Sequence, residues 1–278
     1  MPGATRRGWK VAARVLQSVA TVDLAVSRVQ GAYRHFFEGL LPSVLTDAEL
    51  TNLSTRLYDR RGPNQFGHEP LTWELQWLEK HLPNSPAHIL VGGAGYGREC
   101  AWLQQLGHSV DACEPSRAAA VQCQRVVASS GGTCVVASHE DFADAVLDGT
   151  VNAATPLSRR AYDVVVLGWG SLSHVLDPEQ RARIIDASSR IAGGPILASA
   201  RVSNHTTRPF RAERFGRTVG LRFGGRDLPF GILFQPEVGF AATLSPAELE
   251  RIARRAHRRL EWTPGPGIAA IVFAPDAG

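Results

Sequence analysis

Three glycines at alternate positions are the feature of this sequence with the clearest chemical meaning. Gly93, Gly95 and Gly97 lie in ILVGGAGYGRE, where an apolar run ends and a helical pattern begins. Such a turn lets a ligand approach the backbone closely and directs N–H groups and the positive helix N-terminus toward it. The spacing G-x-G-x-G differs from the dinucleotide fingerprint, and no Gly-Lys-Ser/Thr of a phosphate-binding loop follows. The segment predicts a loop that binds a nucleotide-like ligand.

An acidic residue ends the next apolar segment, SVDACEP. Glu114 lies where a carboxylate can accept hydrogen bonds from both hydroxyls of a ribose, at the carboxyl end of a strand next to the glycine loop. An ordinary carboxylate at a strand end is the alternative interpretation. Asp111 is the competing acid, but we expect it inside the strand.

Two further segments follow later apolar runs. In SHEDF, residues 138–142, we expect Asp141 to accept a hydrogen bond from an adenine amino group and Phe142 to pack on the ring; a helix cap with a hydrophobic staple is the alternative. In LGWGSLSH, residues 167–174, small residues around Trp169 are expected to frame the reactive end of the ligand. A core aromatic is the alternative for Trp169.

The elements that must position these residues alternate between strand and helix from residue 87 onward. Short, nearly all-apolar segments alternate with helical patterns, which predicts a parallel sheet covered by helices on both faces. The helical patterns lie at 98–106, 116–129 and 178–192. Ser245 begins a further capped helix, and RLEW and IAAIVF close the chain as two strands.

The first part of the chain is helical in pattern. The expected helices span 9–37, 46–58 and 70–82. The break between Pro83 and Pro86 predicts a domain boundary, with a helical cap or lid at 1–84 and a second domain at 85–278. Within the second domain, residues 202–243 are rich in Arg, Gly and Phe, and we expect them to form a β-rich insert on the substrate side.

Together, these segments resemble the class I S-adenosylmethionine-dependent methyltransferases of small-molecule type, in order and spacing. The resemblance covers residues 85–200 well and 245–274 more loosely. It implies an α/β fold with a Rossmann-like seven-stranded mixed sheet whose last strand is antiparallel. It also implies S-adenosyl-L-methionine as the cofactor and S-adenosyl-L-homocysteine as its product.

The resemblance also implies cofactor contacts. These are Gly92, Gly93, Ala94, Gly95 and Gly97 in the loop, Glu114 with Pro115 at the ribose, Glu140, Asp141 and Phe142 at the adenine, and Gly168 with Trp169 at the methionine side. One departure is Val91, where the family often has an acidic residue that helps to fix the cofactor's amino group or the loop. The Asn/Asp-Pro-Pro-Tyr/Phe signature is also missing, which argues against base methylation.

His174 is the candidate catalytic residue, because it follows the fourth strand near the expected methyl group. An imidazole suits a general base for a hydroxyl acceptor. Capping or packing against the following helix is the alternative. His205 in the insert is the second candidate base, and we expect Tyr58, Arg201 and His205 to contact the substrate. We expect a structural role for His139.

The expected function is methyl transfer to a small molecule or a short modified peptide, by an O-methyltransferase of specialised metabolism. The alternatives are an N-methyltransferase acting on a small amine, a catalytically silent partner protein with this fold, a nicotinamide oxidoreductase and a nucleic-acid methyltransferase. The sequence leaves open the acceptor atom, the substrate and the oligomeric state.

Composition restricts the partners. A net charge of +4 does not indicate a dedicated nucleic-acid binder, and four cysteines without a C-x-x-C pair predict buried free thiols and no metal site. Arg14, Gln17 and Asp23 interrupt the first apolar stretch, so we expect no export signal, no membrane span and a cytoplasmic protein. Valines at helical spacing there predict an amphipathic helix that packs on the protein or a partner, including a homodimer; a membrane-surface helix is the alternative.

Overall fold

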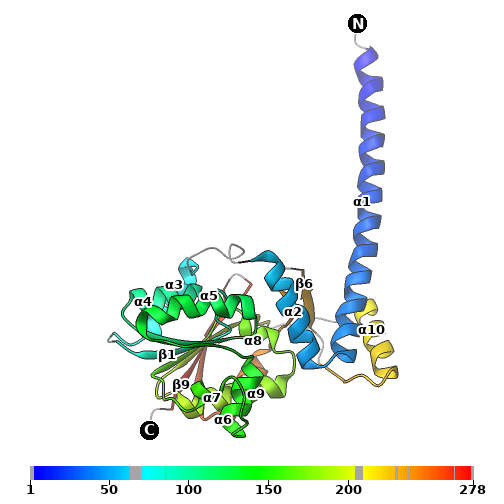
Figure 1. Ribbon diagram of the computed structural model, residues 1–278. Coiled ribbons are helices and arrows are strands. Elements are labelled where there is room, and N and C mark those ends of the chain that lie inside the picture. The colour runs from blue at the N-terminus through cyan, green and yellow to red at the C-terminus, as the bar shows by residue number, and fades with distance from the viewer. Residues whose placement is uncertain are drawn as a thin grey trace. The chain divides into compact units, whose positions relative to one another are not determined.

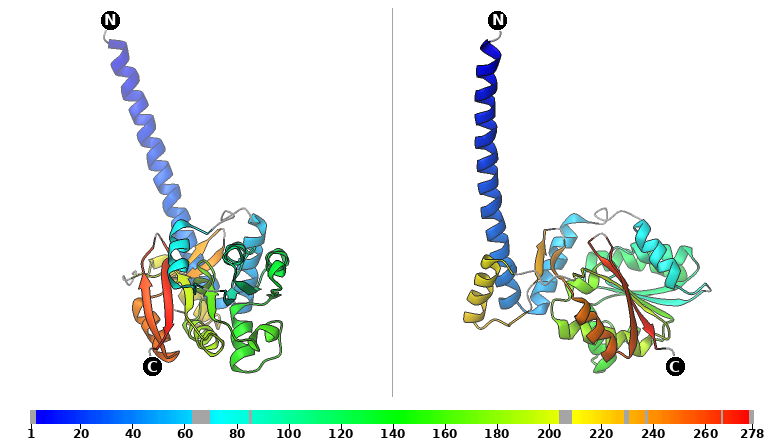
Figure 2. Two further views of the ribbon diagram at one scale, coloured as in Figure 1. Left: turned by 90° about the vertical axis from the view of Figure 1, so that its left-hand side faces the viewer. Right: turned by 180° about the vertical axis from the view of Figure 1, so that it is seen from behind.

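Seven strands form one mixed sheet (Figure 1). They are β1 His88–Gly92, β2 Ser109–Glu114, β3 Cys134–Val136, β4 Val164–Leu167, β5 Ile196–Ala200, β8 Arg258–Thr263 and β9 Ala269–Pro275. Their order is β3-β2-β1-β4-β5-β9-β8. Strands β1 to β5 pair in parallel, whereas β9 is antiparallel to both of its neighbours, β5 and β8. Figure 2 shows β8 and β9 side by side. The predicted α/β fold with a seven-stranded mixed sheet is confirmed.

The structure, a computed structural model, describes residues 3–62, 70–84, 86–203, 209–228, 231–236, 238–265 and 267–276, and side chains from residue 21 onward except at 61. The chain divides into two compact units. The smaller comprises Met1–Val44 and Pro209–Phe230, and the larger comprises Leu45–Arg208 and Gly231–Gly278. The sheet and every candidate site residue that the structure describes belong to the larger unit.

Helices cover both faces of the sheet. Those after the first strands are α4 Arg98–Gln105, α5 Arg117–Val127, α6 His139–Leu147, α7 Thr155–Ser158, α8 Ser171–His174, α9 Pro178–Ile191 and α11 Pro246–Arg255, with a short 3-10 turn at Ala128–Ser130. Alternate strand residues enter two separate cores: Leu90 packs with α6 and α9, whereas Ile89 and Val91 pack with α4 and α5. This burial on both faces explains why the central strands β1, β4 and β5 are nearly all apolar.

The predicted helices of the first 84 residues are present. They are α1 Gly3–Val44, α2 Asp47–Arg61 and α3 Thr72–His81. Thr46 and Glu49 form a capping box at the start of α2. Helices α2 and α3 fall within the larger unit, whereas α1 belongs to the smaller. The description of residues 1–84 as one cap or lid therefore stays a prediction.

The insert contains the two expected strands and one helix that the sequence pattern did not predict. The strands, β6 Ile232–Gln235 and β7 Gly239–Ala242, form an antiparallel hairpin in the larger unit. The helix α10, Arg211–Arg222, packs against α1 in the smaller unit. Gly216 and Gly220 interrupt its sequence pattern, but a Cβ at either position would collide with Phe36 or Ser43 on α1. These glycines therefore permit a close helix contact.

Two further findings concern membrane spans and the cysteines. Among the described helices, none is long and apolar enough to cross a membrane. All four cysteines are free thiols, and Cys100 and Cys123 lie buried with their sulfur atoms 3.8 Å apart.

Candidate functional site

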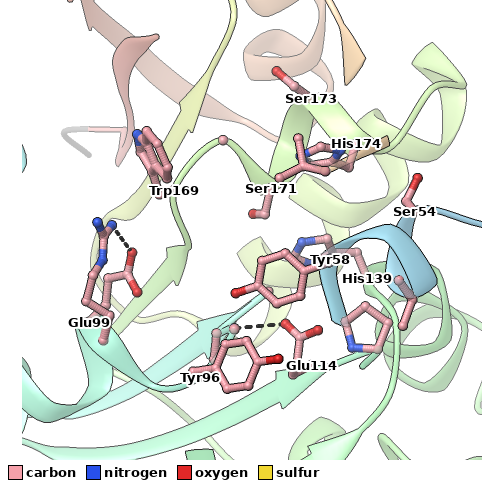
Figure 3. A pocket seen from close by; sticks show the side chains of 18 of the residues that line it. Ser54, Tyr58, Tyr96, Glu99, Glu114, His139, Trp169, Ser171, Ser173 and His174 are labelled. Atoms are coloured by element: carbon pink, nitrogen blue, oxygen red, sulfur yellow. Dashed lines mark hydrogen bonds and ion pairs between the residues drawn. The ribbon is translucent and has the colours of Figure 1, made fainter. Parts of the chain in front are cut away.

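A cavity of about 560 Å³ lies at the carboxyl edge of the sheet (Figure 3). Helix α2, the glycine loop, the start of α4, the end of β2, the β4–α8 turn and the β6–β7 hairpin contribute to its wall. Of the expected site residues, ten line it: Tyr58, Gly93, Ala94, Gly95, Gly97, Glu114, Pro115, Trp169, His174 and Arg201. The topology thus brings most of the predicted residues to one place.

The glycine loop has a backbone and a packing that only glycine satisfies. Gly93, Gly95 and Gly97 have φ angles of 66°, 55° and 91°, in the left-handed region. A Cβ would lie 2.7 Å from the Cβ of Ser171 at Gly93 and 2.6 Å from the Tyr58 hydroxyl at Gly95. The bare backbone therefore lets the side chains of Ser171 and Tyr58 approach the loop closely.

Glu114 points its carboxylate into the cavity beside this loop (Figure 3). Oε2 accepts from the Gly95 N–H and Oε1 from the Ser116 N–H, both at 2.8 Å. Burial raises the pKa of Glu114 to about 7, although the two N–H groups favour its ionised form. Each oxygen keeps capacity to accept a further hydrogen bond from a ligand hydroxyl.

Asp111, the competing acid, has a different role. Its carboxylate accepts hydrogen bonds from Arg160, Tyr162 and the Thr133 N–H, and it lies 2.9 Å from His88 Nε2. It is fully buried and does not line the cavity. Asp111 is therefore part of a buried network within the sheet, and of the two acids in this strand Glu114 is the one that lines the cavity.

His174 lies at the end of α8, and its imidazole lines the cavity. Nδ1 is 2.8 Å from the carbonyl oxygen of Phe240. Because a carbonyl only accepts, Nδ1 carries the hydrogen and the neutral ring keeps a lone pair on Nε2. Burial lowers the pKa of His174, and the charge of Arg201 lowers it further. Asp177 caps the following helix, so the capping alternative for His174 does not apply.

His139 and Ser171 also line the cavity, and the sequence did not single them out as ligand contacts. His139 is 8% exposed, and burial lowers its pKa to about 4. Within the described chain, His139 Nε2 and Ser171 Oγ are buried without a hydrogen-bond partner. Buried polar atoms are normally paired, so both are candidates to bind a ligand. The only sequence signal was their place directly after the third and fourth strands.

An ion-pair network lies at the start of α4. Arg98 Nη2 is 3.1 Å from both oxygens of Glu74 and 2.7 Å from Glu99 Oε1. The guanidinium carbon also lies 5.4 Å from the centre of the Trp169 ring. Arg98 and Glu99 line the cavity, and Glu74 does not. The sequence does not indicate this network, because residue 74 is remote from the glycine loop in the chain.

The expected adenine contacts lie elsewhere. Asp141 Oδ2 accepts from the Ser138 N–H at 2.9 Å in a capping box, and Phe142 is buried in the core. Neither of them, nor Glu140, lines the cavity. This segment therefore has the helix-cap structure that was the alternative interpretation, and His139 is its contribution to the cavity.

Gly92 and Gly168 hold the loop rather than line the cavity. The Gly168 N–H donates to the Gly92 carbonyl at 2.8 Å. A Cβ at Gly168 would lie 2.7 Å from the Gly93 carbonyl oxygen, so the two backbones need glycine to lie this close. His205 lies outside the described residues.

Comparisons with known proteins agree with this architecture. No family model matches the sequence, and no curated protein matches it significantly. Among solved structures, the chain is similar to the CcbJ methyltransferase from Streptomyces caelestis, with 14% identity, a TM-score of 0.51, and coverage of 83% of this chain and 100% of that one. It is also similar to magnesium protoporphyrin IX methyltransferase (ChlM) from Synechocystis PCC 6803 with bound SAH, at 14% identity, a TM-score of 0.45, and coverage of 90% and 95%. The chain therefore has the Rossmann-like fold of the class I S-adenosylmethionine-dependent methyltransferases, as its motifs predict.

Proposed function

We propose that this protein transfers a methyl group from S-adenosylmethionine to an oxygen atom of a small molecule. One observation carries the proposal: the glycine loop, Glu114 and His174 line the same cavity, and His174 Nδ1 is bound to the Phe240 carbonyl, which leaves Nε2 as the nitrogen that can accept a proton. The first two are the parts expected to hold an adenosyl group, and the third is the part expected to take a proton. The fold provides independent support.

The residues of the cavity fit this cofactor. Gly93, Gly95 and Gly97 form part of the cavity wall with backbone atoms alone, so a ligand can approach the loop backbone closely. Glu114 would accept from the ribose hydroxyls, and Trp169 with Gly170 would flank the methionine side. When bound, the cofactor supplies an electrophilic methyl group on a sulfonium with a good leaving group. The protein therefore contributes mainly by positioning the acceptor in line with that group.

His174 would act on the acceptor. Its Nε2 would accept the proton of a hydroxyl group as the oxygen forms its bond to the methyl carbon. The Phe240 carbonyl accepts from Nδ1–H at 2.8 Å, which fixes the ring orientation and favours the charged ring that results. The proton then leaves to solvent, and the ring returns to its neutral form.

The acceptor side of the cavity supports a small, polar substrate. Thr51, Ser54 and Thr55 of α2 contribute hydroxyl groups, and Gln235 and Arg201 contribute further donors. Ligand pockets are typically about 300–1,000 Å³, and this cavity of about 560 Å³ would hold both the cofactor and its acceptor. That volume favours a small molecule, or one side chain of a short peptide, over a larger partner. Action in specialised metabolism belongs to the same proposal.

Calorimetry with S-adenosylhomocysteine and S-adenosylmethionine tests the cofactor. Binding of both to the purified chain is expected, and no binding of either at millimolar concentration would overturn the proposal.

The acceptor atom is tested separately, by screening hydroxylated and amine compounds for conversion of S-adenosylmethionine to S-adenosylhomocysteine. With a hydroxyl acceptor, His174→Gln should reduce turnover about 100-fold and leave S-adenosylhomocysteine affinity unchanged. Turnover of amines alone, at the same rate in that variant, would instead establish an N-methyltransferase. No turnover with any compound, despite cofactor binding, would favour the catalytically silent partner protein.

A further inference from the structure

An arginine and a glutamate at the start of α4 form an ion pair in the wall of the cavity. Val91, the position at which an acidic residue was expected from the resemblance, is fully buried in the core and offers no charge to the cavity. Arg98 and Glu99, in the first turn of α4, do line it. Figure 3 shows Glu99 on the same side of the cavity as Trp169, away from His139.

Arg98 is held firmly but is not saturated. Its side chain is 10% exposed, and Nη2 carries the hydrogen bonds to Glu74 and Glu99. Within the described chain, Nη1 is buried with no hydrogen-bond partner. A buried guanidinium N–H without a partner costs free energy, which a bound acceptor would recover. A carboxylate is the acceptor that a guanidinium binds best.

Glu99 is held in the same way. Its side chain is 8% exposed, and Oε1 accepts from Arg98 at 2.7 Å. In the part of the chain that the structure describes, this is the only hydrogen bond to its side chain, so Oε2 keeps its full capacity. Glu74, Arg98 and Glu99 together carry one positive and two negative charges, so their sum is −1. Such a group attracts a cation, and an ammonium group is the cation that a carboxylate oxygen hydrogen-bonds.

We propose that Arg98 and Glu99 form a binding site for an α-amino-acid zwitterion, in which Arg98 Nη1 donates to the ligand carboxylate and Glu99 Oε2 accepts from its ammonium group. The inference rests on the proposed function, since the amino-acid tail of the methyl donor is such a zwitterion. In this assignment, Glu99 at the start of α4 supplies the negative charge that strand β1 lacks at Val91. Glu74 positions Arg98 from outside the cavity.

Two ligands separate this site from the rest of the cavity. S-adenosylhomocysteine carries the amino-acid tail, and 5′-methylthioadenosine has the same adenosine and sulfur without it. Calorimetry on the full chain should show that wild type binds the first at least tenfold more tightly, because charge-assisted hydrogen bonds contribute about tenfold to hundredfold each.

Glu99→Gln and Glu74→Gln form a matched pair. Both remove a carboxylate from Arg98 Nη2, but only the first removes one that lines the cavity. Glu99→Gln should weaken S-adenosylhomocysteine about tenfold or more and change 5′-methylthioadenosine less than twofold. Glu74→Gln should weaken the binding of either ligand less than Glu99→Gln weakens the binding of S-adenosylhomocysteine. Retained 5′-methylthioadenosine binding also shows that each variant is folded.

Arg98→Gln tests the other half of the site with the decarboxylated analogue of S-adenosylhomocysteine. This variant should bind the complete ligand about tenfold more weakly and the decarboxylated one as wild type does.

These measurements distinguish an error in the proposed function from an error in the assignment of Arg98 and Glu99. If wild type binds neither S-adenosylhomocysteine nor 5′-methylthioadenosine, the proposed function is wrong. If wild type binds the two ligands equally, or if Glu99→Gln weakens them equally, the cofactor binds but the assignment of Arg98 and Glu99 is wrong. Equal losses in Glu99→Gln and Glu74→Gln would also overturn it, because they would show an indirect structural effect.

Discussion

The ionisation of Glu114 is expected to control ligand affinity at neutral pH. Its pKa is raised to about 7 by burial, so the neutral form predominates below that pH. A ribose diol donates hydrogen bonds and prefers the carboxylate, so S-adenosylhomocysteine binding should weaken as pH falls through about 7. Calorimetry at pH 6 and pH 8 in buffers of different ionisation enthalpy checks this, with proton release expected near pH 6.5. Glu114→Gln should lose both the proton release and most of the affinity.

The tautomer of His174 can be measured without a substrate. The Phe240 carbonyl requires the hydrogen on Nδ1, and burial holds the pKa of His174 below its ordinary value. Nitrogen NMR of the labelled chain should show the Nδ1–H tautomer, with a pKa lower than that of a free imidazole. His174→Gln identifies the signal. An Nε2–H tautomer would leave no base facing the cavity and would contradict the role given to this residue.

At the scale of the elements, a methyl group added to the glycine loop should weaken ligand binding as well as destabilise the fold. Gly95→Ala puts a Cβ against the Tyr58 hydroxyl at positive φ, whereas Gly107→Ala has positive φ but open space around it. Both should destabilise the fold by about 1 kcal/mol through backbone strain. Only Gly95→Ala should also weaken S-adenosylhomocysteine binding. Equal binding by the two variants would show that the loop does not contact the ligand.

Glycines in the helix α1 provide a second matched pair, within the smaller unit. A Cβ at Gly39 would collide with the Glu213 carbonyl of α10, whereas nothing lies within 4 Å of one at Gly31. Gly31→Ala should therefore stabilise the helix by up to about 1 kcal/mol. Gly39→Ala should lower the free energy of unfolding of the smaller unit by roughly 1–3 kcal/mol, the usual range for overpacking. Thermal unfolding followed by circular dichroism distinguishes them. Stabilisation by Gly39→Ala would contradict the close contact of α1 with α10.

The sequence predicts elements best where local pattern and burial agree. The strands β1, β4 and β5 are nearly all apolar because both of their faces are covered, and Ser245 caps the helix that it was expected to begin. Helix α10 was missed because Gly216 and Gly220 read as breaks, although their role is to admit a partner helix. The cause lies in a tertiary contact that no local pattern contains.

Dependence on tertiary contacts also distinguishes the site residues that the sequence predicts from those that it does not. Glu114 and Gly95 are fixed by their place at strand ends, so the pattern locates them. Asp141 satisfied the same kind of pattern, but its carboxylate caps its own helix instead. Arg98 depends on Glu74, which comes from another helix, so its role becomes visible only in three dimensions.

For the whole molecule, the proposed cofactor site and the proposed proton acceptor lie in one cavity of the larger unit. The cytoplasmic location and the homodimer through the first helix stay predictions. Val22, Val26 and Val29 are exposed on that helix, which is the arrangement that a partner helix would need.

A crystal structure of the full chain with saturating S-adenosylhomocysteine would show whether the cavity binds the methyl donor. We expect the ribose hydroxyls on Glu114, the amino-acid tail at Arg98 and Glu99, and the sulfur between Trp169 and His174. An empty cavity, or the ligand bound elsewhere on the chain, would contradict it.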